Sequence, residues 1–96
     1  MKMIMISYNQ AIEEEVTDIL ARCGMENYTK WTQVQGKGKT SGTHLGSEVW
    51  PGLNNVLFCA VEESKAKSCL DCVEELRNRL GKEGVKAFVW DLEATT

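Results

Sequence analysis

The chain has 96 residues, of which 43% are hydrophobic and 26% charged, and its net charge is −3. This length allows one domain with one modest core, and the composition is that of a folded chain and excludes a disordered one. The slight negative charge provides no basic surface for nucleic acid or an anionic membrane. The apolar run at the start, in residues 1–10, is too short for a signal peptide or a spanning helix, so we expect a cytoplasmic protein without membrane insertion.

The chain begins with a predicted strand followed by a helix. Residues 2–8 form a nearly continuous apolar run, which is typical of a central strand buried on both faces. Asn9 is a candidate helix N-cap, and the glutamates at 13–15 suit the first turns of a helix, where we expect them to be solvated. Apolar residues recur at helical spacing as far as Cys23, and Gly24 is a glycine of the kind that ends helices.

Two further strands are predicted on either side of a long glycine-rich segment. Residues 28–35 alternate in character and are rich in β-branched and aromatic side chains. Their alternation predicts that Lys30 and Val34 share one face of the strand and that Trp31 lies on the other. Residues 55–61 are mostly apolar and predict another buried strand.

The last third of the chain predicts a helix and a final strand. Residues 62–80 carry apolar side chains at helical spacing and end at Gly81, and residues 85–93 form the last predicted strand. The element order is therefore βαββαβ. Two βαβ halves side by side make a ferredoxin-like α+β sandwich, in which two helices cover four antiparallel strands, and we expect residues 1–96 to form one domain.

The predicted sheet has apolar side chains on both of its faces. In the first strand, Met3 and Met5 point to one side and Ile4 and Ile6 to the other. Two helices cover only one face of a four-stranded sheet. Residues 94–96, which follow the last strand, are too few to cover the second face, so we favour oligomerisation over that alternative.

The segment 36–52, between the second and third predicted strands, holds five of the eight glycines and the only proline. Loops of this length inside a compact domain are usually functional or disordered. Its first part, residues 36–42, is basic and flexible, with backbone amides free to surround an anion. From composition alone, a mobile connector with solvated lysines is an equal alternative. A phosphate-binding P-loop is not matched, because no helix follows the lysine directly.

The end of the second strand carries a resemblance to a known family. Residues 32–39 read TQVQGKGK and are followed by Gly42, Thr43 and His44. This stretch of sequence resembles the PII signal-transduction family, in which a strand end of the form TxVxG is followed by GxG, a basic residue and a long loop. The βαββαβ order with an enlarged loop between strands two and three is similar as well, over most of the chain.

The resemblance implies a compact homotrimer with small-molecule sites in the clefts between subunits. In that family the base of the long loop and a shorter glycine-basic loop hold ATP or ADP, and here the ligand is expected to be such a nucleotide or another small anionic effector. The matching residues are Gly36, Lys37, Gly38 and Lys39 in the long loop and Gly84 and Lys86 in the shorter one.

The resemblance also implies that the long loop docks on a protein target, such as a transporter or an enzyme. His44 and Trp50 are our candidates for that contact. The chain departs from the family in three ways. The second loop reads GKEGVKAF where the family has a sequence similar to GDGKIF. The arginine-bearing tail is missing, and the long loop has no tyrosine that could be uridylylated. We therefore expect a divergent PII-like protein and not a nitrogen sensor proper.

The four cysteines, Cys23, Cys59, Cys69 and Cys72, are expected to be reduced, because the sequence has no secretion signal. The CxxC pair Cys69–Cys72 lies inside a predicted helix and is expected to pack in or beside the core. The alternative function is a divalent-metal-binding trimer of the CutA type that uses His44 and cysteines. No nucleophile with an adjacent base is visible, so no catalytic residue is assigned and an enzyme is not expected.

Overall fold

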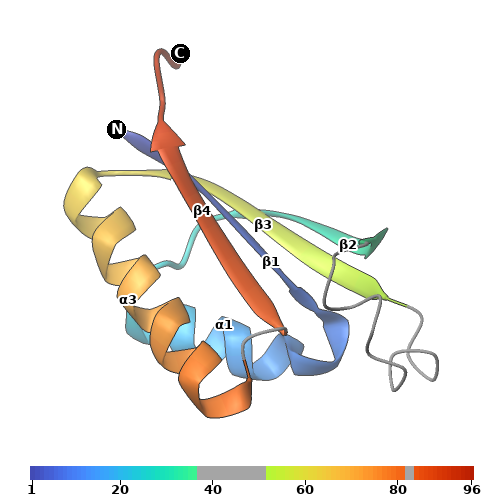
Figure 1. The fold of residues 1–96 in the computed structure, drawn as a ribbon. Helices are drawn as coiled ribbons and strands as arrows, with labels where there is room; N and C mark the ends of the chain where they lie inside the picture. The colour runs from blue at the N-terminus through green and yellow to red at the C-terminus, as the bar shows by residue number, and fades with distance from the viewer. Residues whose placement is uncertain (37–51, 82–83) are drawn as a thin grey trace.

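The computed structural model describes residues 1–36, 52–81 and 84–96, and it confirms the predicted element order (Figure 1). The elements are β1 (Lys2–Asn9), a 3-10 turn η1 (Gln10–Ile12), α1 (Glu13–Arg22), β2 (Thr29–Gln35), β3 (Leu53–Val61), α3 (Glu63–Leu80) and β4 (Val85–Asp91). The Asn9 side chain caps η1, by accepting a 2.8 Å hydrogen bond from the Ala11 amide, and α1 starts one turn later than Asn9 indicates. Of the helices described, none is long and apolar enough to cross a membrane.

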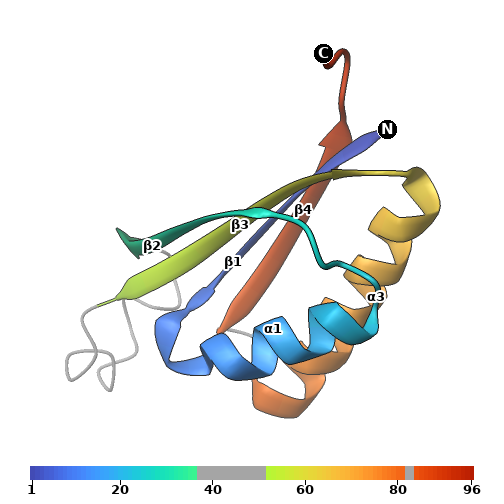
Figure 2. The same ribbon diagram turned by 180° about the vertical axis from the view of Figure 1, so that it is seen from behind.

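The four strands form one sheet in the order β2-β3-β1-β4, with every neighbouring pair antiparallel. Both helices lie against the same face of this sheet (Figures 1 and 2). The predicted α+β, ferredoxin-like sandwich is therefore confirmed. The central strands β1 and β3 are those whose sequences are apolar on both faces, whereas the helices cover only one of these faces (Figures 1 and 2).

The hydrophobic core lies between the helices and the sheet. In β1 every second residue faces the helices, so that Ile4, Ile6 and Tyr8 are almost completely buried. The apolar stripes of both helices pack on them, which follows from the helical spacing of those residues. The helix residues buried in this core are Val16, Ile19, Leu20, Ala66, Cys69, Val73 and Leu76.

The opposite face of the sheet, which we call the outer face, carries large apolar side chains. Trp31, Phe88 and Trp90 are 56%, 41% and 45% exposed. Met5 in the centre pairs with Phe58 on one side and Phe88 on the other. The ring of Phe58 meets Trp31 edge-on, with centroids 4.9 Å apart. In the described part of the chain no helix packs on this face (Figure 2).

Strand β2 contains a bulge that its sequence did not predict. Trp31 pairs with Val56, but Val34 pairs with Asn54, so two residues of β2 stand opposite Asn55 alone. Gln33 absorbs the extra residue with a positive φ of 56°, an uncommon conformation outside glycine. As a result Val34 lies on the same face as Trp31, and the predicted strict alternation is wrong beyond the bulge.

The expectation that all cysteines are reduced is also wrong. Cys23, at the end of α1, forms a disulfide with Cys72 in α3, and their Cα atoms are 6.7 Å apart. The two helices lie side by side in the sandwich, which brings together residues 49 positions apart in the sequence. Cys59 and Cys69 are free thiols, and Cys69 is fully buried in the core, as predicted.

Candidate functional site

The predicted ligand-binding residues that the structure describes, Gly36, Gly84 and Lys86, all belong to one end of the sheet. Gly36 follows the last residue of β2, and Gly84 precedes the first residue of β4. These strands are the two edges of the sheet, with β3 and β1 between them. Three strand spacings of about 4.8 Å separate the edges by roughly 14 Å. One subunit therefore places the two glycine turns at the same end without bringing them together (Figure 1).

The remaining predicted residues lie outside the described part of the chain. These are Lys37, Gly38, Lys39, His44 and Trp50, so their predicted roles stay predictions. The structure does describe where the segment that contains them leaves and rejoins the sheet.

Gly36 closes the base of the long loop. Its N–H donates a hydrogen bond of 3.2 Å to the carbonyl of Gly52, which joins the start of the loop to its end. A Cβ at position 36 would lie 2.3 Å from Nδ2 of Asn54, closer than any real contact allows. A larger residue here therefore requires the end of the flexible Asn54 side chain to move away.

The second glycine turn is attached to the end of β1. The carbonyl of Gly84 accepts a 2.9 Å hydrogen bond from the Asn9 N–H, directly before β4 starts. Lys86, two residues on, is exposed and pairs with Ser7 on the outer face. Its Nζ lies 5.6 Å from the centre of the Phe88 ring. Lys86 thus places a cation beside this turn at the β4 edge.

A partly buried polar cluster lies beside the loop base, and the sequence analysis missed it. The Glu13 carboxylate accepts hydrogen bonds from the Tyr8 hydroxyl, from Lys30 Nζ and from Asn55 Nδ2, the last at 2.8 Å. Asn55 Oδ1 in turn accepts a 3.3 Å hydrogen bond from the N–H of Gln33, the bulge residue. Glu13 was expected to be solvated with its neighbours, and that interpretation is wrong for this residue.

The protonation states in this cluster are held by its own contacts. Burial alone acts to raise the pKa of Glu13, but the hydrogen bonds from its three partners outweigh burial and lower that pKa. Burial, followed by the hydrogen bond to Glu13, raises the pKa of the Tyr8 phenol far above its ordinary range. Glu13 is thus a carboxylate with occupied lone pairs, which makes it a structural anchor and not a free base.

A shallow hollow of about 520 Å³ opens beside this cluster. Its lining comes from η1, from the start of α1 and from the bulge in β2, and it consists of Gln10, Ala11, Glu13, Thr32, Gln33 and Asn55. Most of its lining residues carry polar side chains, and it lies next to the strand end that leads into Gly36. The bulge and the Glu13 cluster therefore set the direction in which β2 enters the loop base.

Comparison with known proteins decides the family. A family model described as nitrogen regulatory protein P-II matches residues 1–96. This chain belongs to the P-II family. No curated protein sequence matches it significantly.

Solved structures with the same fold include P-II-like proteins of two bacteria. CPII from Thiomonas intermedia K12, bound to ADP, AMP and acetate, is 24% identical and superimposes with a TM-score of 0.73, covering 99% of this chain and 88% of its own. CPII bound to ADP, AMP and bicarbonate gives 22% identity and a TM-score of 0.69, with 95% and 84% covered. A PII-like signalling protein from Thermus thermophilus gives 23% and 0.60, with 93% and 83% covered.

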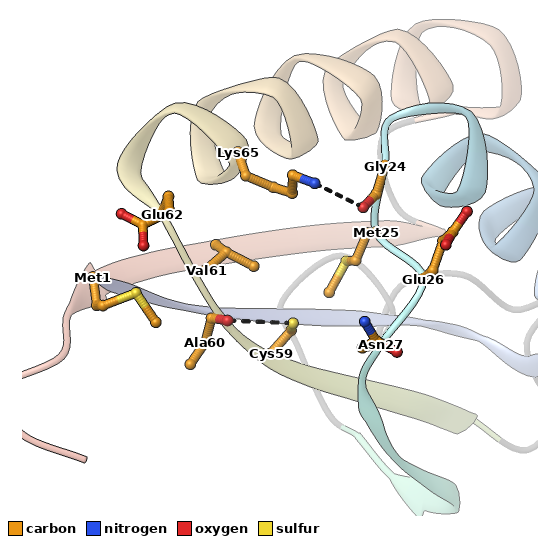
Figure 3. A pocket seen from close by; sticks show the side chains of 10 residues that line it. All are labelled: Met1, Gly24, Met25, Glu26, Asn27, Cys59, Ala60, Val61, Glu62 and Lys65. Carbon is orange, nitrogen blue, oxygen red and sulfur yellow. Dashed lines mark hydrogen bonds between the residues drawn. The ribbon is translucent and has the colours of Figure 1, made fainter. Parts of the chain in front are cut away.

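The P-II chain has a second hollow, of about 290 Å³, at the other end of the sheet (Figure 3). It lies between the connection that follows α1 and the start of α3. Lys65 Nζ reaches across it to donate a 3.1 Å hydrogen bond to the Gly24 carbonyl, and the Cys59 thiol points toward it (Figure 3). Burial raises the pKa of Cys59, so this thiol is not activated despite the nearby lysine.

The metal-binding alternative loses part of its ligand set. Cys23 and Cys72 are bonded to each other and provide no thiolate for a metal. Within residues 1–36, 52–81 and 84–96, no three His, Cys, Asp or Glu side chains gather in a way that could hold an ion. His44 lies outside the described residues.

Proposed function

We propose that this P-II family member is a regulatory protein that binds an adenine nucleotide in the clefts of a homotrimer and signals to a protein target through the 36–52 loop. The observation that carries the proposal is the position of the two glycine turns. Gly36 and Gly84 lie at one end of the sheet but on its opposite edges, in a chain whose family is regulatory.

A neighbouring subunit would complete the site. The β2 edge of one copy would need to lie beside the β4 edge of the next, which joins Gly36 of one chain to Gly84 and Lys86 of another. The outer face supports such an assembly, because Trp31, Phe88 and Trp90 expose apolar surface typical of an interface. A closed ring of three copies uses both edges of every subunit.

The chemistry of the turns favours an anionic ligand. The ammonium of Lys86 suits phosphate oxygens, and the sequence adds Lys37 and Lys39 beside Gly36. The related CPII structures hold ADP and AMP together with acetate or bicarbonate. We therefore place ADP or ATP first among ligands and a small carboxylate or bicarbonate second.

We propose that the long loop carries the signal by shifting between an ordered and a disordered state. Both ends of the loop meet at the Gly36–Gly52 hydrogen bond, next to the proposed phosphate site. A ligand that contacts Gly36 thus acts where the loop begins, and it shifts the loop toward one arrangement by its differential affinity. The target is a protein such as a transporter or an enzyme, recognised through His44 and Trp50.

Calorimetry on the full chain tests the nucleotide site. Titration with ATP, ADP and AMP should give binding for at least one of them, and Lys86→Ala should weaken it about tenfold or more, since a hydrogen bond to a charged group contributes about 1.5–3 kcal/mol. Lys67→Ala, an equal charge change on the exposed side of α3, is the matched control and should bind normally. Light scattering should give three times the chain mass of 10.8 kDa. A monomer, or no binding of any of the three nucleotides, would sink the proposal.

A further inference from the structure

We propose that the Cys23–Cys72 disulfide is a reversible redox site, which a dithiol reductant opens to release the α1–β2 connection from α3. The inference goes beyond nucleotide binding and does not depend on it.

The disulfide lies where a reductant has access. Cys23 and Cys72 are both partly exposed, one at the end of α1 and the other on α3. Cys69, three residues before Cys72 on the same helix, is fully buried. Both residues of the crosslink are therefore partly open to solvent, from which a dissolved thiol can approach them.

The other thiols of the chain are poor internal exchange partners. Burial raises the pKa of Cys69 and also that of Cys59, so both remain protonated near neutral pH. Because the thiolate is the attacking species, neither thiol readily displaces Cys23 from Cys72, although Cys69 is only one turn away. The folded protein can thus keep one disulfide beside two thiols without scrambling, and exchange requires a partner from outside.

The crosslink is one of several attachments that hold the segment after α1, the others being backbone hydrogen bonds to the end of the helix and the contact with Lys65. Cys23 directly precedes Gly24, which has a φ of 85° and whose carbonyl accepts the hydrogen bond from Lys65. The following Met25 is buried, and the chain then runs along the second hollow to β2 (Figure 3). Since β2 is an edge strand, paired only with β3, this connection determines how firmly its first residues are held.

The reaction balances with a dithiol as the reductant. One thiolate of the dithiol attacks a sulfur of the crosslink, forms a mixed disulfide and releases the other cysteine. The second thiol of the dithiol then displaces the remaining cysteine. Cys23 and Cys72 together gain two electrons and two protons, and the dithiol becomes a disulfide.

Thiol labelling and hydrogen exchange on the native full-length protein test the proposal with dithiothreitol as the probe. Peptide mapping after alkylation in denaturant should find Cys59 and Cys69 free in the oxidised protein and all four cysteines free after reduction. Circular dichroism should stay native on reduction. Amide protection of Gly24 and Met25, whose N–H groups bond to the end of α1, should fall by roughly an order of magnitude, while β1 is unchanged. Reoxidation should restore the same pair.

Cys72→Ser should reproduce the exchange pattern of the reduced protein, and Cys59→Ser, outside the crosslink, should leave the oxidised pattern intact. If Cys72→Ser fails to fold, the reduced native chain still provides the comparison. A disulfide that resists excess dithiothreitol in the folded protein overturns the inference, as does global unfolding on reduction, unchanged protection of Gly24 and Met25, or reoxidation to a Cys69–Cys72 pair.

Discussion

Removal of the Cys23–Cys72 crosslink should lower stability by an amount that follows from its position in the chain. The cysteines are 49 residues apart. Closing a loop of that length removes about 14 cal/mol/K from the unfolded chain, which corresponds to about 4 kcal/mol at 25 °C. Small domains are stable by about 5–15 kcal/mol, so the chain without the crosslink should still fold at 25 °C.

The assay is urea or thermal unfolding of Cys23→Ser/Cys72→Ser against the native chain, at one protein concentration, because assembly also stabilises. The double variant should melt about 15 °C or more below the oxidised native protein. Reductant should bring the native protein to the same midpoint and leave the double variant unchanged. Cys59→Ser controls for loss of a thiol outside the crosslink.

Two outcomes would refute this reasoning. The first is a double variant within about 1 kcal/mol of the oxidised native protein, since the chain-entropy estimate then has no counterpart in solution. The second is a native protein whose midpoint does not respond to reductant although the double variant is destabilised. In that case the loss would come from the serine substitutions and not from the crosslink.

Three further predictions concern the polar cluster, the loop base and the outer face. Glu13→Ala should cost about 1–3 kcal/mol in urea unfolding, because it leaves buried Tyr8 and Asn55 groups without their acceptor, whereas Glu14→Ala on the exposed side should be nearly neutral. Since the folded pKa of Glu13 is lowered, its contribution is present above the ordinary value of 4.5 and lost as the pH falls below it; acid titration of Glu13→Gln should lack that part of the loss. Gly36→Ala should destabilise by about 1 kcal/mol or less, because the Asn54 amide that it meets ends a flexible side chain, and adding Asn54→Ala should recover this loss; no recovery would contradict the steric cause. Trp90→Glu should shift the assembly to monomers in light scattering, while Leu70→Glu, equally apolar but on α3, should not; equal behaviour of the two would argue against an outer-face interface.

Local patterns in the sequence were sufficient for the fold. Continuous apolar runs identified the central strands, helical spacing identified both helices, and their order led to the ferredoxin-like sandwich. The apolar second face of the sheet was visible for the same reason, since alternation along a strand reports both of its faces. The sequence around Gly36 was also sufficient to indicate the family to which the chain belongs.

The contacts beside the site depended on packing in three dimensions. The cluster around Glu13 joins side chains from β1, α1, β2 and β3, and nothing in the run of three glutamates distinguishes Glu13 from its solvated neighbours. At the bulge, the N–H of Gln33 is bonded to Asn55 on another strand. Periodicity shows which side of a helix or strand is apolar, but it does not show which polar side chains from different elements will contact each other.

The cysteines show the same division. Helical spacing placed Cys69 in the core, because that depends only on its own helix. The bond between Cys23 and Cys72 requires the end of α1 to lie against the middle of α3, and only the packing of both helices on one face of the sheet brings them there. The sequence alone indicates which residues can be buried or can react. Which residues they contact depends on the tertiary structure.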